Sequence, residues 1–310
     1  MAELLEDIAP GTWRPNRDRA KQVQAVVNII CGLFAAISIA TTLGIIGTLI
    51  FETIEFFKEV PLWNFLTDTR WTPLFASKQF GIFVLISATV MISVISILVA
   101  LPLGLLSAIC LSEYASPQVR KILKPILEIL AGVPTVVYGY FALLTVTPFL
   151  QSFIPELQGF NALSAGIVMG VMITPMVASL SEDAIYSVPR SLRDGSYALG
   201  ATKRETVVSV ILPAALSGIV ASLILAISRA IGETMIVTLA AGASPTLGFN
   251  PMVSVMTMTA FIVQISLGDA PAGTLAYKTL FVVGMTLFVM TLALNIFSFW
   301  FVRRFREKYD

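Results

Sequence analysis

The stretch SVPRSLRDGSYALGATKRETVVSVILP, residues 187–213, is a long polar segment between two apolar runs. Asp194 is a plausible helix N-cap, because its carboxylate can accept hydrogen bonds from the unpaired N–H groups of a first helical turn. Apolar residues then recur near helical spacing, and Pro213 suits the first turn of a further helix. We therefore expect a short helix over 194–209, a bend and then a long apolar helix. An alternative is an amphipathic helix that rests on lipid.

Composition places the chain in a membrane. Of its 310 residues, 56% are hydrophobic and 13% are charged, whereas soluble domains average about 25% charged residues. The net charge of +1 gives no reason to expect nucleic acid as a partner. Histidine is absent, which removes the commonest metal ligand and the usual general base. Cys31 and Cys110 lie in apolar runs, and we expect both to be small buried residues.

Six segments reach the length of about 20 mainly apolar residues that a spanning helix needs. They are residues 24–50, 81–111, 125–149, 162–181, 214–241 and 276–302. The chain is thus predicted to be an all-α integral membrane protein with six transmembrane helices. Its predicted parts are a cytoplasmic tail 1–23, a membrane domain 24–302 with external loops 51–80 and 242–275 and a cytoplasmic loop 187–213, and a basic tail 303–310.

The basic residues predict the orientation, because cytoplasmic loops carry an excess of Lys and Arg. One side holds 15 of them and the other only Lys58, Arg70, Lys78 and Lys278. Both termini are therefore predicted to be cytoplasmic, and the first span is expected to act as an uncleaved anchor, since the polar tail before it is unlike a signal peptide. The 15 are Arg14, Arg17, Arg19, Lys21, Arg120, Lys121, Lys124, Arg190, Arg193, Lys203, Arg204, Arg303, Arg304, Arg306 and Lys308.

Residues 250–268 are apolar and nearly long enough to be a seventh span. A seventh span would put the basic C-terminal tail outside and break the charge asymmetry. We therefore interpret this segment as an interfacial or re-entrant helix on the external face.

Proline removes a backbone hydrogen-bond donor and kinks a helix. The second, third and fourth predicted spans contain Pro102, Pro134 and Pro175, respectively. For any one of them a packing kink is the plainer interpretation. Gly132 with Pro134 is more suggestive, because a small residue beside a break allows close helix contact and leaves backbone polar groups free to face a cavity.

The segment 187–213 resembles the EAA loop of ABC importer permeases, whose pattern is E-A-A, three residues, Gly, nine residues and I-x-L-P. Asp194, Gly195 and Ser196 stand in the E-A-A positions, Gly200 is the glycine, and Val210, Leu212 and Pro213 close the pattern. The resemblance implies the type I ABC importer permease fold, with this helix docked in a cleft of an ATPase. The residues expected to carry this coupling are Arg193, Asp194, Gly195, Ser196, Tyr197, Gly200, Ala201, Leu212 and Pro213.

Three motifs are similar to phosphate-importer permeases of the PstC type: LAGVPTVVYGYFAL at 130–143, VPRSLRDGSYALGAT at 188–202 and SRAIGETMIVTLAAG at 228–242. In the sister type, PstA, the glutamate of the third motif is typically followed by Thr-Ala-Pro. The resemblance implies a bacterial inner-membrane protein in a heterodimer with a PstA-like permease, a PstB-like ATPase dimer and an external PstS-like phosphate-binding protein. The external loops 51–80 and 242–275 would receive the binding protein.

Arg229 and Glu233 lie inside the fifth span, where each charge costs at least about 3 kcal/mol. Arg229 is sixteen residues beyond Pro213, or roughly 24 Å of helix, and Glu233 is expected one turn further on the same face. One interpretation is a structural salt bridge. The other is an anion path, in which the guanidinium grips phosphate oxygens in a bidentate manner.

Glu233 suits an anion path only for an anion that carries its own proton. HPO₄²⁻ has an O–H that a carboxylate can accept, whereas sulfate at neutral pH has none, so Glu233 would favour phosphate over sulfate. Hydroxyl groups in membrane helices more often bond their own backbone. Four residues with hydroxyl groups are nevertheless further candidates for the path, namely Ser228, Thr234, Thr135 and Tyr138. Glu128 is expected to form an interfacial ion pair with Lys124.

The sequence therefore predicts a transport subunit that is not itself an enzyme, because it has no GxxxxGK[ST] nucleotide-binding loop. No cofactor is expected in this chain; ATP and Mg²⁺ would be used by the partner ATPase. The alternatives are the PstA-like subunit, an ABC permease for another oxyanion, and a secondary carrier working alone, for which the EAA-like loop would have no role. An intramembrane enzyme is remote, since no nucleophile–base pair is evident.

Overall fold

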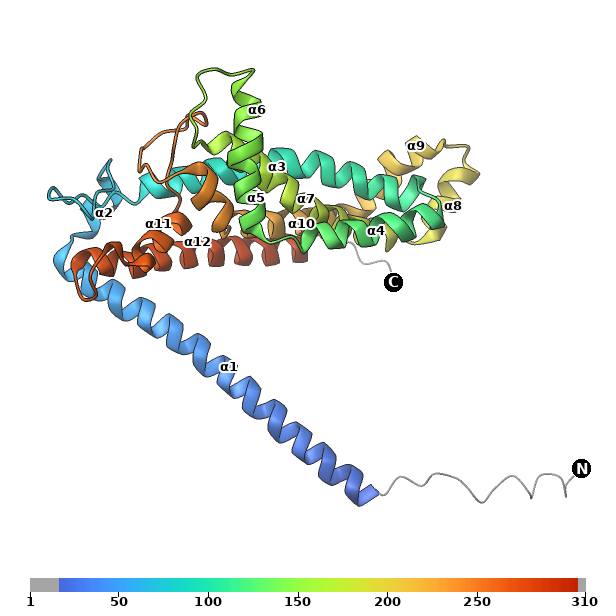
Figure 1. The fold of residues 1–310 in the computed structure, drawn as a ribbon. Coiled ribbons are helices and arrows are strands. Elements are labelled where there is room, and N and C mark those ends of the chain that lie inside the picture. Colours follow the sequence, from blue (N-terminus) through green and yellow to red (C-terminus); the bar gives the residue numbers. More distant parts are fainter. Residues whose placement is uncertain (1–16, 306–310) are drawn as a thin grey trace, which may run out of the picture. The chain divides into compact units, whose positions relative to one another are not determined.

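The computed structural model describes residues 17–305, so the predicted tails at 1–16 and 306–310 lie outside it. The chain divides into two compact units, residues 1–51 and 52–310. Helix α1 (Arg17–Glu59) supplies the described part of the first unit and enters the second with its last two turns (Figure 1). Its apolar stretch is longer than the predicted span 24–50, running over residues 21–59.

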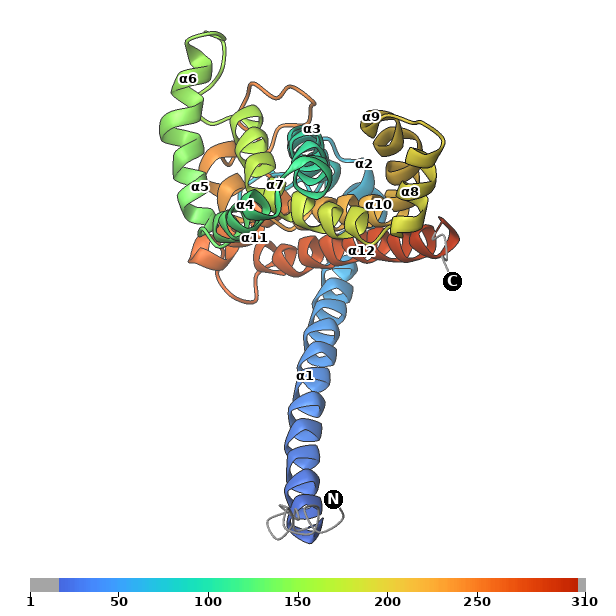
Figure 2. The same ribbon diagram turned by 90° about the vertical axis from the view of Figure 1, so that its right-hand side faces the viewer.

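The second unit is built on two helices, α3 (Phe83–Ile109) and α7 (Ala162–Tyr186), which lie side by side (Figures 1 and 2). Small residues face the contact, and their backbones approach closely as is usual between membrane helices. An added Cβ at Gly166 would lie 2.6 Å from Ile95 Cγ2, and one at Gly170 would lie 2.6 Å from Val99 Cβ. The buried residues of α3 and α7 therefore form the centre of the main core.

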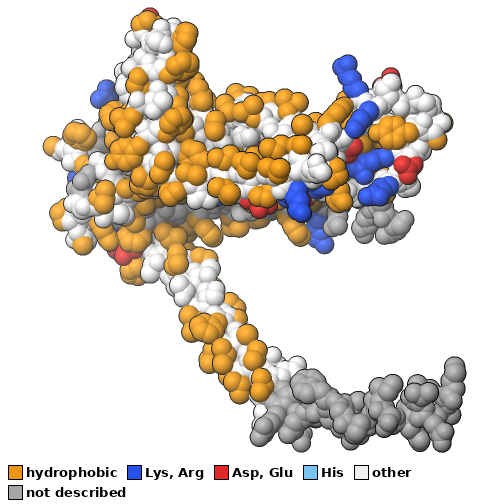
Figure 3. Space-filling view, turned by 45° about the vertical axis from the view of Figure 1, so that its right-hand side comes forward, with side chains coloured by type: hydrophobic (Ala, Val, Ile, Leu, Met, Phe, Trp, Pro, Cys, Tyr) orange, Lys and Arg blue, Asp and Glu red, His pale blue; other side chains and the backbone are white. Residues whose placement is uncertain are grey.

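Helix α10 (Leu212–Ile231) packs against both helices of this pair, and α12 (Leu275–Phe305) packs against α10. Figure 3 shows that hydrophobic side chains cover much of the surface of this unit, whereas Lys and Arg side chains gather mainly at one end. That end carries α8 (Arg190–Ala198) and α9 (Lys203–Thr206), which belong to the loop between the fourth and fifth spans. An apolar middle with a basic end is the surface expected of a membrane protein.

The predicted third span is broken at Gly132–Pro134. Helix α4 (Pro117–Ala131) ends there, and α5 (Thr135–Phe141), a π-helical turn (Ala142–Val146) and α6 (Thr147–Gln151) continue at 85° to it. Figures 1 and 2 both show this steep change of direction. The break predicted from Gly132 and Pro134 is confirmed, whereas Pro102 and Pro175 lie inside continuous helices.

The fifth span also differs from its predicted bounds, 214–241. A π-helical turn (Val207–Ile211) joins α9 directly to α10, and Pro213 lies in the first turn of α10, as predicted. Helix α10 ends at Ile231, and a second helical segment of mainly π geometry occupies Val237–Ala241. A non-helical break at residues 232–234 therefore divides the predicted span.

The remaining elements gather aromatic side chains into a second core. Helix α2 (Leu62–Thr67) and the isolated antiparallel bridge between Trp71 and Phe80 bring Phe56, Phe65 and Trp71 together, with Phe261 at 5.1 Å from the Trp71 ring. Phe261 belongs to α11 (Met258–Gln264), which continues as a π-helical turn (Ile265–Asp269). The start of α12 is tied to the end of α1 by an ion pair between Lys278 and Glu59 at 2.9 Å.

The described residues contain five helices that are long and apolar enough to cross a membrane, and the broken pair provides a sixth. Residues 250–268 form no spanning helix; α11 is short, and its first turn is buried in the core. The prediction of six spans without a seventh is therefore confirmed. Cys31 is exposed on α1 and Cys110 is exposed in a π-helical turn (Cys110–Tyr114), so the expectation that both are buried is wrong.

Replacing Gly170 by Ala should destabilise the protein, because the new methyl group would force α3 away from α7. Overpacking of this kind costs about 1–3 kcal/mol, and we expect a lower midpoint of thermal unfolding in detergent. Gly195→Ala is the matched control, since a Cβ there meets nothing within 4 Å and alanine favours the helix. Equal unfolding midpoints for Gly170→Ala and wild type would contradict the close α3–α7 contact.

Candidate transport path and coupling surface

Arg229 lies in the last turn of α10, and its side chain is exposed on this chain. Its guanidinium Nη2 lies 3.6 Å from the Sδ of Met172 on α7, which is a weak acceptor. Among the side chains that the structure describes, no carboxylate forms an ion pair with it. A guanidinium keeps its charge at all physiological pH values, so Arg229 presents an uncompensated positive charge on an apolar helix.

Glu233 lies in the break after α10 and is buried. Its Oε1 accepts hydrogen bonds from the backbone N–H groups of Met235 (3.1 Å) and Ile236 (3.4 Å). Its main-chain oxygen accepts one from Thr259 Oγ1 at 2.7 Å. Glu233 thus caps the helical segment that begins after the break, in the way a carboxylate caps any helix N-terminus.

The expectation that Arg229 and Glu233 share one helix face is wrong. The helix ends at Ile231, between the two residues, and the described chain holds no ion pair between them. The structural salt bridge considered above is therefore absent from this structure. The two charges have separate surroundings: one is exposed beside Met172, and the other is turned to backbone donors.

The two broken spans meet each other. Gly139 of α5 packs on the second half of the fifth span, where an added Cβ would lie 2.8 Å from Leu239 Cδ1 and 3.2 Å from the Met235 carbonyl oxygen. Tyr138 donates its hydroxyl to the carbonyl of Leu130 at 3.0 Å, across the break of the third span. Thr135, half-buried, begins α5. The structure thus brings Thr135 and Tyr138 onto a helix that lies against residues 235–241.

The hydroxyl groups of Ser228 and Thr234 make their hydrogen bonds away from α5. The hydroxyl of Ser228 lies 3.4 Å from Asn295 Oδ1 on α12, whereas its neighbour Arg229 lies against α7. Thr234 donates to the carbonyl of Gly232 at 3.3 Å, inside the break itself. Hydroxyls that bond nearby backbone are the usual case in membrane helices.

The loop 187–213 folds as two short helices rather than one. Helix α8 begins at Arg190 after Pro189, so Asp194 is an exposed residue inside it and the predicted N-cap is wrong. The chain turns at Gly200, whose φ of +83° favours glycine. Thr202 then caps α9 in a capping box with Glu205. Ser196 and Thr206 join the two helices through a 2.9 Å hydrogen bond between their hydroxyls.

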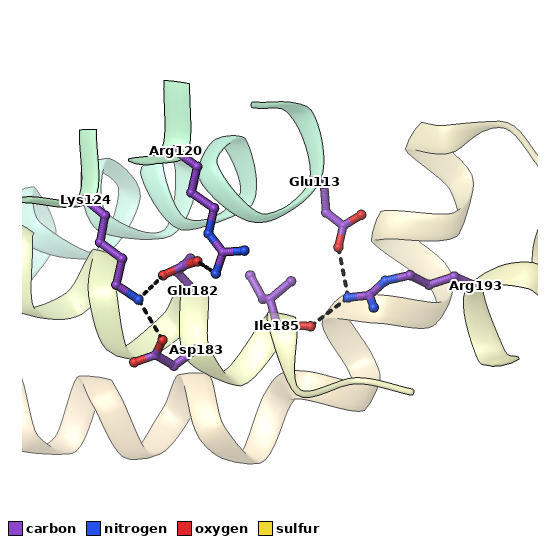
Figure 4. Close-up of polar contacts among 7 residues, drawn as sticks. All are labelled: Glu113, Arg120, Lys124, Glu182, Asp183, Ile185 and Arg193. Carbon is purple, nitrogen blue, oxygen red and sulfur yellow. Dashed lines mark hydrogen bonds and ion pairs between the residues drawn. The ribbon is translucent and has the colours of Figure 1, made fainter. Parts of the chain in front are cut away.

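Arg193 fixes α8 to the membrane helices (Figure 4). Its Nη2 lies 3.0 Å from Glu113 Oε1 and donates to the Ile185 carbonyl at 2.8 Å, while its Nη1 donates to the Val188 carbonyl at 2.9 Å. Both side chains of the ion pair are largely buried, with exposed fractions of 16% and 8%. One side chain therefore joins α8, the end of α7 and the π-helical turn after α3.

The turn between α8 and α9 is the most exposed apolar feature of this loop. Leu199 is 91% exposed and Tyr197 is 42% exposed. Gly195, Gly200 and Asp194 are exposed beside them, whereas Ala201 is half-buried and Leu212 lies at the start of α10. Leu199 was not among the predicted coupling residues, although a leucine next to a turn glycine in a polar loop is a signal that could have found it.

The predicted ion pair between Lys124 and Glu128 is replaced by contacts with α7 (Figure 4). Lys124 Nζ lies 2.8 Å from Glu182 Oε2 and 3.0 Å from Asp183 Oδ1, and Arg120 also pairs with Glu182. The Glu182 side chain is 1% exposed. Sequence reasoning missed Glu113 and Glu182, although a basic loop beside a carboxylate at the end of a span favours such pairing.

The chain matches, over residues 100–309, the family described as binding-protein-dependent transport system inner membrane component. It belongs to this family of ABC importer permeases and is a multi-pass protein of the inner membrane. The family predicted from the loop 187–213 is thereby confirmed. In such systems ATP is used by separate ATPase subunits, and the permease works with these and with a binding protein.

Three named permeases are similar to this chain over three quarters of its length or more. The probable ABC transporter permease protein YqgH of Bacillus subtilis is 34% identical over 281 residues, which cover 90% of this chain and 89% of that protein. The probable phosphate transport system permease protein PstC of Methanocaldococcus jannaschii is 34% identical, with 75% and 78% covered. PstC of Haemophilus influenzae is 32% identical, with 76% and 79% covered. The resemblance to the PstC type is thus confirmed.

Solved structures agree on the fold. A bacterial ABC transporter involved in the import of alginate matches with a TM-score of 0.63 at 18% identity, covering 94% of this chain and all of that one. The MetNI methionine ABC transporter, in inward-facing form, matches with a TM-score of 0.53 at 19% identity, covering 73% and 95%. These likenesses establish the type I importer permease fold of this chain.

The Arg193–Glu113 pair should be coupled energetically. We expect Arg193→Gln and Glu113→Gln each to lower stability, because each leaves a largely buried charge without its partner. The double variant should lose less than the sum of the two, by roughly 1–3 kcal/mol, as measured by unfolding of the purified protein. The exposed pair Lys58–Glu55 is the control, and its coupling should be much weaker because solvent screens both charges. Additive losses at Arg193 and Glu113 would contradict the anchoring role.

Proposed function

We propose that this chain is the PstC-like permease subunit of an ATP-driven importer of inorganic phosphate. It would form a heterodimer with a PstA-like permease and work with a PstB-like ATPase dimer and an external PstS-like phosphate-binding protein. Both termini would be cytoplasmic. The names of the PstC relatives, at 29–34% identity over about three quarters of this chain, support the substrate and the partners.

The observation that carries the proposal is the uncompensated charge of Arg229. A permanent cation on an apolar membrane helix, without a carboxylate partner in the described chain, needs an anion or polar groups of another subunit. A guanidinium offers the planar pair of donors that fits two phosphate oxygens. Arg229 would therefore contact phosphate where it passes between the two permeases, with α5 and its Thr135 and Tyr138 on the neighbouring wall.

Coupling to the ATPase would use α8 and α9. Tyr197 and Leu199 are the apolar side chains exposed at this turn and would enter a cleft of the ATPase. Motion of α8 would reach the spans through Arg193, because this side chain bonds to the end of α7 and to Glu113. ATP and Mg²⁺ would bind in the partner ATPase, whose closure would open the path outward; hydrolysis would reset it.

Replacing Arg229 by Gln should abolish most phosphate uptake by the complete importer in proteoliposomes. Loss of one hydrogen-bonded charge to an anion lowers transport by roughly 10- to 100-fold. Arg229→Lys should retain an intermediate rate, because it keeps the charge and loses the bidentate geometry.

Assembly and ATPase activity of the same preparations distinguish the outcomes. A variant that assembles and hydrolyses ATP without transporting phosphate supports a role in the path. Unchanged uptake by Arg229→Gln would contradict the proposal, and a complex that falls apart would assign Arg229 to the permease interface.

Glu233 would add selectivity for phosphate over sulfate. Its Oε1 is held by two backbone donors, and no donor among the described residues contacts Oε2. That oxygen could accept the O–H of HPO₄²⁻ and would repel sulfate, which has no proton to give. Glu233 would then cap the second half of the broken span with Oε1 and accept a hydrogen bond from the protonated oxygen of the anion with Oε2.

Replacing Glu233 by Gln should weaken this selectivity while preserving the cap, since the amide oxygen can still accept from Met235 and Ile236. We expect sulfate to inhibit phosphate uptake about tenfold more strongly in the variant. Glu233→Ala is the control for capping and should also lower stability by about 1 kcal/mol. Unchanged sulfate inhibition in Glu233→Gln would leave only the capping role.

A further inference from the structure

A basic pocket lies between α4 and the C-terminal end of α7, away from Arg229. Its volume is about 680 Å³, and its lining includes four cationic side chains, Arg120, Lys121, Lys124 and Arg190. One carboxylate, Glu128, also lines it, together with apolar groups such as Leu111 and Pro117. The pocket thus combines a positive charge with an apolar wall.

The four cations fall into two pairs with different roles. Arg120 and Lys124 hold the buried Glu182 and so fix α4 to α7, and the Arg120 guanidinium lies 4.3 Å from the centre of the Tyr186 ring. Lys121 and Arg190 are exposed, and neither forms an ion pair with any described residue. The charges of Lys121 and Arg190 are therefore not used to hold helices together, and both can interact with a ligand.

The distribution of apolar and basic residues on α4 indicates what lies next to the pocket. This helix is strongly amphipathic, and no residue of it is fully buried in this chain. Its apolar face is exposed, and its basic residues lie on the other face and in the first half of the helix, where a spanning helix with a basic end meets the lipid headgroups. The exposed apolar residues are Val119, Ile122, Leu123, Ile126, Ile129 and Leu130.

We propose that this pocket binds a phosphate group, and that the group belongs to an anionic membrane lipid such as phosphatidylglycerol. Arg190 can grip two phosphate oxygens and Lys121 can supply a point charge, while the acyl chains would lie along the apolar face of α4. A headgroup that carries its own cation would be repelled by the unpaired charges of Lys121 and Arg190. Free inorganic phosphate is the other source of the same chemistry, without a use for the apolar face.

The test uses the complete importer, purified in a neutral detergent and examined by native mass spectrometry. Phosphatidylglycerol, phosphatidylcholine or inorganic phosphate is added to wild type and to Lys121→Gln/Arg190→Gln. Each basic residue near an anionic surface contributes roughly a fivefold change in affinity, so we expect the double variant to bind phosphatidylglycerol at least about tenfold more weakly. Arg204→Gln/Lys78→Gln, which removes two charges outside the pocket, should bind like wild type.

The outcomes separate cleanly, provided that size-exclusion chromatography shows intact complexes. Preferential binding of phosphatidylglycerol that only the Lys121/Arg190 variant loses supports the lipid site. Binding that is equal in all variants, or equal for phosphatidylcholine, overturns it. Binding of inorganic phosphate that the pocket variant loses, without binding of phosphatidylglycerol, overturns the assignment to lipid and identifies a site for the free anion. None of these results depends on Arg229, so failure here leaves the proposed transport role untouched.

Discussion

A bilayer offers no water to backbone N–H and C=O groups, so every interruption of a membrane helix must be satisfied by the protein itself. This chain interrupts two of its spans and meets the requirement with side chains. Tyr138 donates to the Leu130 carbonyl across the first break, and Glu233 accepts from two N–H groups after the second. Thr259 adds a donor to the Glu233 carbonyl. Each of these hydrogen bonds pairs a backbone group next to a break with a side chain of the protein.

The two interruptions lie where the structure needs irregular backbone. Gly139 lets α5 approach residues 235–239 closely, so that the broken halves of the third and fifth spans pack on each other. Irregular backbone within a membrane is tolerated where it is covered by protein or faces a cavity. Arg229 lies immediately before one break, on the last turn of a helix, where its charge also complements the helix dipole. The proposed path therefore coincides with the least regular part of the fold.

The C-terminal end of α7 is a junction for two polar attachments (Figure 4). Glu182 and Asp183 bind the basic face of α4, and two backbone carbonyls, those of Ile185 and Val188, accept from Arg193 of α8. No residue of α4 or α8 is fully buried in this chain. Ionic and hydrogen-bonded contacts are thus prominent in holding both helices, and such contacts are directional enough to transmit a movement from one element to the next.

The sequence by itself determined the class of protein. The length and apolar content of each segment decide whether it can span a bilayer, and the placement of Lys and Arg decides its orientation, so neither depends on tertiary contacts. It also identified the family, the break at Gly132–Pro134 and the place of Pro213, since each depends on a few adjacent residues. Only the tertiary structure decided the partners of the charges. Lys124 binds α7 instead of Glu128, and Glu233 caps a helix instead of facing Arg229. Glu233 does not share a helix face with Arg229 because the helix ends at Ile231, between the two residues. Lys124 pairs outside its own helix because α7 packs against α4 and brings Glu182 and Asp183 within reach, and the spacing of residues along α4 carries no information about that neighbour.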